Sequence, residues 1–191
     1  SFAAVRSNGL IAMTLEPDDY LGWVRHTTGN QDLIVVTRNG QSIRFNERQV
    51  RVMGRQAGGV GAIRFIENDE IAGMDVINDP EATLLVVTEF GFGKRTKLHE
   101  YRLQQRYGYG IRTLSSKSQE EKTGRIIGAS VVSPDDDLTL ITVSGMALRT
   151  EVGMINVYKR ATSGVKMIHL SKEDVIVSMA IVSGDIEARR L

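Results

Sequence analysis

The chain has 191 residues, 41% of them hydrophobic, which is enough for a core in one domain or in a small array of repeats. It contains no cysteine, which excludes a disulfide framework and a thiolate metal site and fits a reducing cytoplasm. There is no apolar run of transmembrane length and no signal-peptide pattern, and the net charge of +1 by itself indicates no partner.

A fixed period organises the chain. Three glycines each stand four residues before an arginine, and three other arginines each stand four residues before a glycine. These pairs are Gly40 with Arg44, Gly91 with Arg95, Gly145 with Arg149, Arg55 with Gly59, Arg106 with Gly110, and Arg160 with Gly164. Gly40, Gly91 and Gly145 are separated by 51 and then 54 residues. A period of this length predicts propeller-like blades or a solenoid.

Residues 1–28 resemble the end of a repeat. Residues 9–15 match residues 59–65 at a shift of 50, and residues 20–24 then match residues 70–74. The first residue is not Met and the chain begins inside a repeat, so we expect a fragment of a longer protein that opens with part of a blade.

The first full repeat is expected over residues 29–78. Residues 33–36 form a short apolar run, which is typical of a strand buried on both faces. Asn39-Gly40 favours a two-residue hairpin, because both residues readily adopt positive φ. Residues 41–46 then alternate between apolar and polar side chains, as a half-solvated strand does.

A long, polar and basic connection over residues 46–59 follows this hairpin. Residues 60–65 alternate again and predict a third strand, and residues 71–77 predict a fourth. Helix signals are weak, because no segment keeps an apolar i, i+3, i+4 pattern over three turns. The helix candidates are residues 47–53 and their counterparts near His99 and Gly153.

The same order of elements recurs in residues 79–133 and 134–183. The second repeat carries an insertion rich in Ser, Lys and Glu over residues 115–123, which we expect to be a solvated loop tip. The tail, residues 184–191, has no strand pattern. The predicted strands of the third repeat are residues 138–143, 146–150, 165–170 and 175–182.

Four-stranded units at this period predict an all-β, propeller-like array of blades. We expect an incomplete arc of three full blades and part of a fourth. The residues expected to be largely buried are Ile43, Phe45, Val60, Ile63, Leu85, Val87, Leu140, Ile141, Val165 and Ile168.

Catalytic and metal-binding chemistry finds little support in the sequence. His26, His99 and His169 fall at unrelated repeat positions, and no pair has the spacing of a zinc motif. Residues 91–95 lack the glycine spacing and the Ser or Thr of a phosphate-binding loop. The three aspartates at residues 135–137 are expected to form a polar turn. No cofactor is indicated, and a hydrolytic propeller would need a cluster of acids and bases that the sequence does not show.

The charges are sorted along the chain. Residues 38–60 contain five arginines and one acid, and residues 94–112 contain six basic residues and one acid. Acids collect elsewhere, around Asp18, Asp69 and Asp135. A near-neutral protein that separates its charges in this way can present a basic face to a polyanion.

Arginines at equivalent repeat positions favour double-stranded DNA as the partner, since a guanidinium can bind two phosphate oxygens. Aromatic residues do not recur as stacking platforms, so duplex is favoured over single strand. Arg44, Arg95 and Arg149 are expected to project from equivalent strands, and the other cations to extend one basic rim from which the acidic turns are kept away. Two alternatives are solvated arginines without a ligand and a protein-binding propeller. The candidate DNA-binding residues are Arg44, Arg48, Arg51, Arg55, Lys94, Arg95, Lys97, Arg102, Arg106, Arg149, Lys159 and Arg160.

The repeats also carry recognisable motifs. They are Gly-Gln-Ser-Ile-Arg-Phe at residues 40–45 with Glu47, Arg-Val-Met-Gly-Arg at 51–55, Gly-Val-x-x-Ile-Arg at 59–64, Gly-Phe-Gly-Lys-Arg-Thr at 91–96 with Glu100-Tyr101, and Leu-Arg-Thr at 148–150 with Arg160, Thr162 and Gly164-Val165. Together they resemble later blades of the C-terminal domain of the DNA gyrase A subunit, and the resemblance covers nearly the whole chain.

This resemblance implies a β-pinwheel, a propeller variant whose blades exchange strands. It implies a domain around which DNA wraps, so that an ATP-dependent type IIA topoisomerase of the bacterial cytoplasm introduces negative supercoils. The implied partners are DNA, the remainder of the gyrase A protein and the gyrase B protein, with no membrane, and the catalytic residues lie outside this chain. The family's gyrase-A box, Gln-Arg-Arg-Gly-Gly-Lys-Gly, is missing. Residues 104–110 keep only Gln104, Arg106, Gly108 and Gly110 of it, so the paralogous topoisomerase IV A subunit stays an alternative.

Overall fold

The computed structural model describes residues 9–184, and its regular structure is mainly antiparallel β-strand, which confirms the predicted all-β class. The strands are β1 (Asp32–Thr37), β2 (Gln41–Asn46), β3 (Ile71–Ile77), β4 (Thr83–Thr88), β5 (Phe92–Lys97), β6 (Ile111–Arg112), β7 (Ile126–Val132), β8 (Asp137–Thr142), β9 (Ala147–Glu151), β10 (Val165–Lys166) and β11 (Ile176–Val182). The helical turns are η1 (Glu47–Gln49), η2 (Leu98–Glu100), α1 (Ser116–Ser118), η3 (Gln119–Thr123) and η4 (Val152–Met154). Within the described part, no helix has the length and apolarity needed to cross a membrane.

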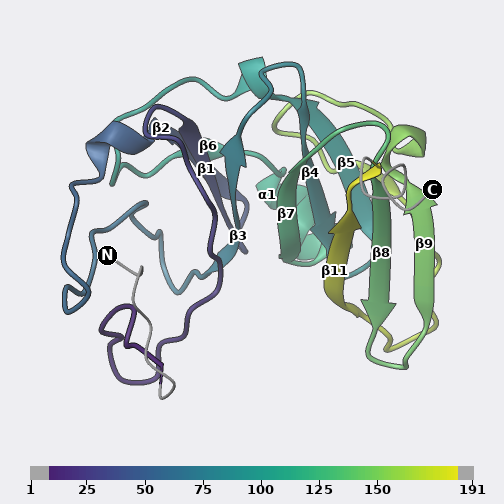
Figure 1. Ribbon diagram of the computed structural model, residues 1–191. Coiled ribbons are helices and arrows are strands. Elements are labelled where there is room, and N and C mark those ends of the chain that lie inside the picture. Colours follow the sequence, from purple (N-terminus) through teal and green to yellow (C-terminus); the bar gives the residue numbers. More distant parts are fainter. Residues whose placement is uncertain (1–8, 185–191) are drawn as a thin grey trace, which may run out of the picture.

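The strands form three sheets that stand side by side around an arc (Figure 1). Their hydrogen-bonded orders are β3-β1-β2-β6, β7-β4-β5-β10 and β11-β8-β9. β6 follows β5 in sequence but pairs with β2 of the preceding sheet, and β10 follows β9 but pairs with β5. The blades therefore exchange outer strands, as the implied β-pinwheel requires. The repeat boundaries drawn from the sequence stay a prediction.

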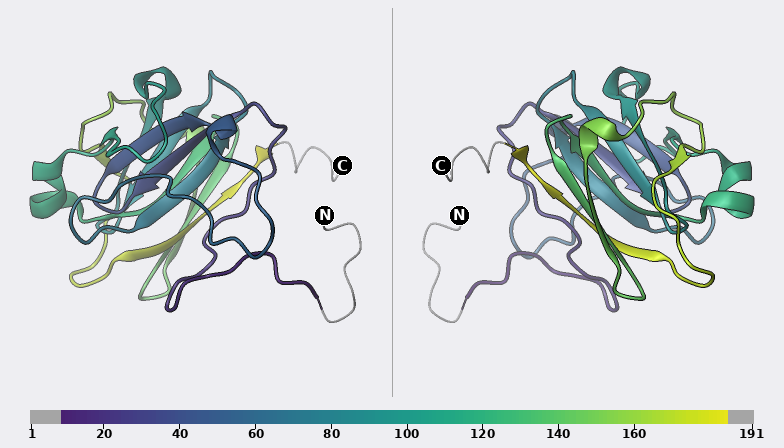
Figure 2. Two further views of the ribbon diagram at one scale, coloured as in Figure 1. Left: turned by 90° about the vertical axis from the view of Figure 1, so that its left-hand side faces the viewer. Right: turned by 90° about the vertical axis from the view of Figure 1, so that its right-hand side faces the viewer.

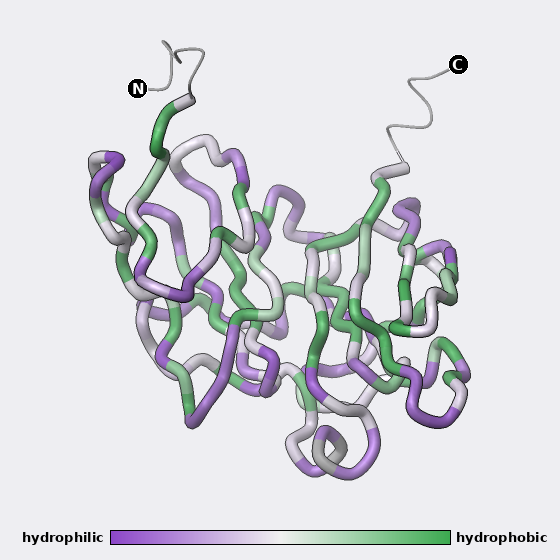
Figure 3. The backbone as a smooth tube through the Cα atoms, turned by 90° about the horizontal axis from the view of Figure 1, so that it is seen from below, coloured by the Kyte–Doolittle hydropathy of each residue, from purple (hydrophilic) through white to green (hydrophobic). Residues whose placement is uncertain are grey.

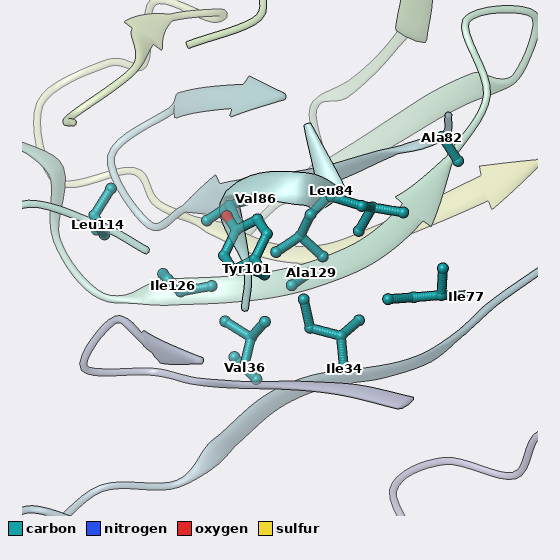
Figure 4. Close-up of a cluster of buried hydrophobic side chains, with 12 residues drawn as sticks. Ile34, Val36, Ile77, Ala82, Leu84, Val86, Tyr101, Leu114, Ile126 and Ala129 are labelled. Atoms are coloured by element: carbon teal, nitrogen blue, oxygen red, sulfur yellow. The ribbon is translucent and has the colours of Figure 1, made fainter. Parts of the chain in front are cut away.

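Alternation along β4 explains how the sheets pack. Leu84 and Val86 join a cluster with Ile34 of β1 between the first and second sheets (Figure 4). Leu85 and Val87 face the other way and pack with β8 of the third sheet. All six residues of β4 are buried, because a sheet lies on either side of this strand. Figure 3 shows the same pattern, with hydrophobic backbone positions along the sheets and hydrophilic ones mostly in the loops.

Most residues expected in the core are buried, namely Ile43, Phe45, Ile63, Leu85, Val87, Leu140 and Ile168. Val60 and Val165 are only half-buried. The expectation for Ile141 is wrong, since this residue is 43% exposed. Ile141 lies on the face of β8 opposite Leu140, and within the described residues no further sheet covers that face.

The predicted strand over residues 60–65 is also wrong. This segment makes only an isolated bridge, between Ile63 and Gly108. Its counterparts, β6 and β10, each pair with the sheet of the preceding repeat, whereas residues 9–28 contain no strand to which it could add. β10 is also shorter than the strand predicted over 165–170.

The glycines that precede β6, β10 and residues 60–65 also differ in whether they contact a neighbouring sheet. Gly110 and Gly164 both have φ of +71°, and a Cβ atom there would lie 2.4 Å from Ser42 O and 2.5 Å from Gly93 O, respectively. Gly59 has φ of +88°, but a Cβ atom there would meet nothing within 4 Å. Gly59 thus likewise has a positive φ, but without the close backbone contact that Gly110 and Gly164 make.

Residues 9–28 and the insertion in the second repeat lie at opposite sides of the stacked sheets (Figure 2). Arg25 of the first segment donates to Asp75 Oδ1 of β3 at 2.8 Å. The insertion forms α1 and η3, and it is not merely the solvated tip that was expected. Gln119 Nε2 donates to Arg38 O at 2.6 Å, and Thr123 is fully buried. Most of the predicted tail, residues 185–191, lies outside the described residues.

Candidate nucleic-acid interface

Each long connection begins with a short helical turn. η1, η2 and η4 directly follow β2, β5 and β9, and they lie along the upper side of the arc in Figure 1. Each is only three residues long, because the next residue is extended and donates its N–H to the first carbonyl of the turn. The helix predicted over 47–53 is therefore limited to Glu47–Gln49.

Arg44, the first of the three arginines in register, does not project freely from its strand. Its Nε donates to Asp32 Oδ2 at 2.9 Å. Its guanidinium also donates to the carbonyls of Leu98 and Tyr101, at 3.1 and 3.4 Å. Both carbonyls belong to the turn that opens the next connection, so Arg44 fastens one repeat to the next.

Arg95 has the same role in the second repeat and is more deeply buried, at 8% exposure. Its guanidinium donates to the carbonyls of Ile155 and Gly153, at 2.7 and 3.1 Å, and burial lowers its pKa. Arg149, the third arginine, is exposed on β9 and pairs with Asp137 at 2.6 Å. The expectation of three equivalent projecting arginines therefore describes only Arg149.

Lys94 lies inside the protein as well, at 1% exposure. Its Nζ donates to Lys159 O at 3.0 Å, to Thr162 Oγ1 at 3.3 Å, and to Arg160 O. Burial and the nearby charge of Arg160 lower the pKa of Lys94 to about 7. This lysine holds the connection of the third repeat against β5 and does not reach the surface.

The remaining candidates lie mainly on the connections. Arg48, Arg51, Arg55, Lys97, Arg102 and Lys159 are exposed, and Arg106 and Arg160 are half-buried. Within the described chain none of these eight cations makes an ion pair, whereas ion pairs are formed by Arg25, Arg38, Arg44 and Arg149. The connections therefore carry positive charge that no carboxylate of the described residues neutralises by an ion pair.

Contacts between repeats position these connections. The Gln49 side chain donates to Gln104 O at 3.2 Å and accepts the Arg106 N–H at 2.6 Å. The Arg106 guanidinium donates in turn to Gln49 O at 3.2 Å. These hydrogen bonds hold the connection of the second repeat against the turn of the first. They therefore also position the segment that carries the exposed cations.

The acidic turns are not all kept away from these connections. Asp69 accepts the Asn39 N–H at 2.9 Å, at the hairpin end of the first sheet and away from η1. The turn around Asp135 lies against η4, since Gly153 N–H donates to Pro134 O at 2.8 Å. That part of the expectation is wrong, because the β7–β8 turn and η4 occupy the same end of the third sheet.

Arg64 is an exposed cation that was not in the predicted set. The guanidinium carbon of Arg64 lies 4.9 Å from the ring centre of Tyr107 and 5.8 Å from that of Tyr109. The two tyrosines have no aromatic counterparts in the other repeats, which was the only sequence signal for this cluster.

Comparison with known proteins gives consistent results. A family model described as DNA gyrase C-terminal domain, beta-propeller, matches residues 31–78, 82–133 and 136–183. The DNA gyrase A protein of Staphylococcus epidermidis is 38% identical over 184 residues, which are 96% of this chain and 20% of that protein. The chain thus spans about a fifth of the length of such relatives.

Two solved structures are similar over most of the chain. The C-terminal domain of a DNA topoisomerase IV superposes with a TM-score of 0.89 at 26% identity, over 96% of this chain and 57% of that one. The C-terminal domain of a DNA gyrase A protein gives a TM-score of 0.81 at 25% identity, over 91% and 58%. Both likenesses agree with the strand exchange between blades.

Proposed function

Because the chain belongs to the family of DNA gyrase C-terminal domains, we propose that it binds duplex DNA without sequence preference and bends it along the connections of successive repeats. The cations assigned to the phosphates are Arg48, Arg51, Arg55, Lys97, Arg102, Arg106, Arg149, Lys159 and Arg160. Arg44, Lys94 and Arg95 support this surface from within and do not touch the DNA.

One observation carries the proposal. Each connection carries exposed cations, and none of them has an ion-pair partner among the described residues. A phosphate backbone supplies charges at regular spacing, and binding it releases condensed counterions. An arc of equivalent basic segments therefore suits a long, curved polyanion better than it suits a small ligand.

Bending accounts for the number of contacts. Curving a short duplex costs on the order of several kcal/mol, depending on its sequence. Contacts spread over successive repeats must offset this cost, so single substitutions should have small effects and combined ones large effects. Reversing the charge of Arg44 or Arg95 would unfold the blades and would not test binding.

The test reverses one exposed cation on each connection, in the triple variant Arg51→Glu, Arg102→Glu and Lys159→Glu. The control carries the same charge change at exposed cations elsewhere, as Lys117→Glu, Arg125→Glu and Lys172→Glu. Fluorescence anisotropy with a 40-base-pair duplex at several salt concentrations gives the affinity and its salt dependence. A wild-type log–log slope of about −0.9 per neutralised phosphate is expected, and it should become shallower by about 2.7 in the triple variant only.

A flat salt response of the wild-type protein would instead favour a protein-binding propeller. Equal losses in the triple variant and the control would show that only net charge matters. Wrapping itself is measured by closing nicked circular DNA on the protein and determining the linking number after the protein is removed. We expect the linking number to change with the amount of protein. An unchanged linking number would show that the protein binds DNA without wrapping it.

The role in the whole enzyme follows from the same proposal. In a bacterial DNA gyrase, acting in the cytoplasm on the nucleoid, this domain would present wrapped DNA to the catalytic parts of the gyrase A protein and to the gyrase B protein. ATP-dependent negative supercoiling would then depend on the direction of wrapping. The A protein of a topoisomerase IV is the alternative parent, and a relaxed-plasmid supercoiling assay with the complete enzyme distinguishes the two.

A further inference from the structure

Arg64 is an exposed cation that contacts two aromatic rings. Its guanidinium lies over the rings of both Tyr107 and Tyr109, which are themselves about half-exposed, at 49% and 57%. Arginine is planar and stacks favourably on aromatic faces, and such contacts restrict its rotamers. The charge of Arg64 is therefore held in place at the surface.

The backbone around this cluster is also constrained. Arg64 N–H donates to Gly108 O at 2.8 Å, and Tyr107 N–H donates to Ala62 O at 2.7 Å. Tyr107 adopts φ of +66°, which is uncommon for a bulky residue, and its ring packs so closely on Gly61 that a Cβ atom there would lie 2.4 Å away. Unusual backbone conformations of this kind cluster at binding and active sites, so the cluster is a candidate for a functional contact.

The cluster has no internal partner for its charge and no copy in the other repeats. Among the described residues, no carboxylate lies within ion-pair distance of Arg64. The equivalent positions are Ser115 and His169 in the second and third repeats. Arg64 therefore has no arginine or lysine counterpart in the other two full repeats.

We infer that Arg64, held by contacts with the rings of Tyr107 and Tyr109, is an anchoring contact for one phosphate group of the bent duplex. The inference rests on the proposed function and deepens it, because it assigns to one cation a larger contribution to DNA affinity than to the other cations of the surface. A mobile arginine loses side-chain entropy when it binds a phosphate, whereas a stacked one has already lost most of it. The rings face the guanidinium, so they position the cation and do not stack on bases.

The matched control is Arg55, an exposed arginine of the preceding connection with no side-chain hydrogen bond or ion pair to the described residues. Both arginines carry one charge, so a purely electrostatic rim would respond equally to either loss. We expect Arg64→Ala to weaken binding of a 40-base-pair duplex about tenfold, which corresponds to about 1.4 kcal/mol. Arg55→Ala should weaken it about twofold.

The role of the rings is tested separately. The pair Tyr107→Phe and Tyr109→Phe keeps the aromatic faces and should bind within about twofold of wild type. The pair Tyr107→Asn and Tyr109→Asn removes both faces, and Asn tolerates the positive φ at residue 107. This variant should lose nearly as much affinity as Arg64→Ala, and it should add little when combined with that substitution. Circular dichroism and the urea midpoint establish that each variant is folded.

The outcomes separate the two proposals. If wild-type protein does not bind the duplex, the proposed function fails. If the duplex binds and Arg64→Ala weakens binding no more than Arg55→Ala does, the anchoring role of Arg64 is refuted. The proposal that the connections bind DNA then still stands. A loss in the Phe pair as large as in the Asn pair would assign the effect to the hydroxyl groups and overturn the positioning role.

Discussion

Replacing Arg95 with alanine should destabilise the protein far more than the same change at Arg149. The two residues are equivalent in the repeat, but Arg95 is buried and donates to two carbonyls of the next repeat, at 2.7 and 3.1 Å. Each hydrogen bond from a charged group contributes about 1.5–3 kcal/mol to stability. Removing Arg95 also removes the cost of burying its charge, which offsets part of the loss of its two hydrogen bonds. We expect Arg95→Ala to lower the free energy of unfolding by roughly 3 kcal/mol.

Arg149 has an exposed side chain, and its ion pair with Asp137 lies at the surface. Such pairs contribute about 0–1 kcal/mol, so Arg149→Ala should change stability by less than 1 kcal/mol. Urea unfolding followed by circular dichroism measures both variants. Arg95→Lys serves as the control for charge, because lysine lacks the fork that reaches two carbonyls and should recover only part of the loss. Equal midpoints for Arg95→Ala and Arg149→Ala would refute the fastening role.

Other predictions concern the interior. Because the pKa of Lys94 is lowered to about 7, the unfolded chain binds one more proton than the folded protein between about pH 7 and the normal lysine pKa, about 10.4. Stability should therefore rise with pH across this window, by up to about 1.4 kcal/mol per unit, and urea midpoints of Lys94→Met should lack this rise. Gly73→Ala should cost about 2 kcal/mol in urea unfolding, because its Cβ would lie 2.3 Å from the Ala129 carbonyl oxygen. Gly128→Ala should cost less than about 1 kcal/mol in the same measurement, since its nearest neighbour is the flexible Met179 side chain.

Much of the fold could be predicted because it depends on local sequence. The apolar run at β1, the turn at Asn39-Gly40 and the alternation of β2 each determine backbone structure within a few residues. The predicted two-residue form of that turn is wrong, since the loop spans residues 38–40 and Gly40, but not Asn39, has positive φ. The period of the repeat then supplied the arrangement of blades. The segment 60–65 has the same local pattern as a strand, but a strand also needs an edge to pair with, and that depends on a neighbouring blade.

The site was harder to predict because a repeated arginine has two physical explanations. A residue that recurs once per blade can face a periodic ligand outside the protein or a periodic contact within it. For Arg44 the contact is internal, with the carbonyls of Leu98 and Tyr101 as acceptors. Backbone carbonyls have no sequence signature, so the sequence could not distinguish the two explanations.

The three arginines also show that position in the array determines what a residue does. Arg95 is covered by the repeat that follows it, whereas no repeat follows Arg149 within the described chain, and its side chain is exposed beside Asp137. A fastening arginine is required wherever two blades meet, whether or not DNA is present. Recurrence of this arginine therefore supports the stacking of blades. The argument for DNA rests instead on the exposed cations that each connection carries, which lack acidic partners among the described residues.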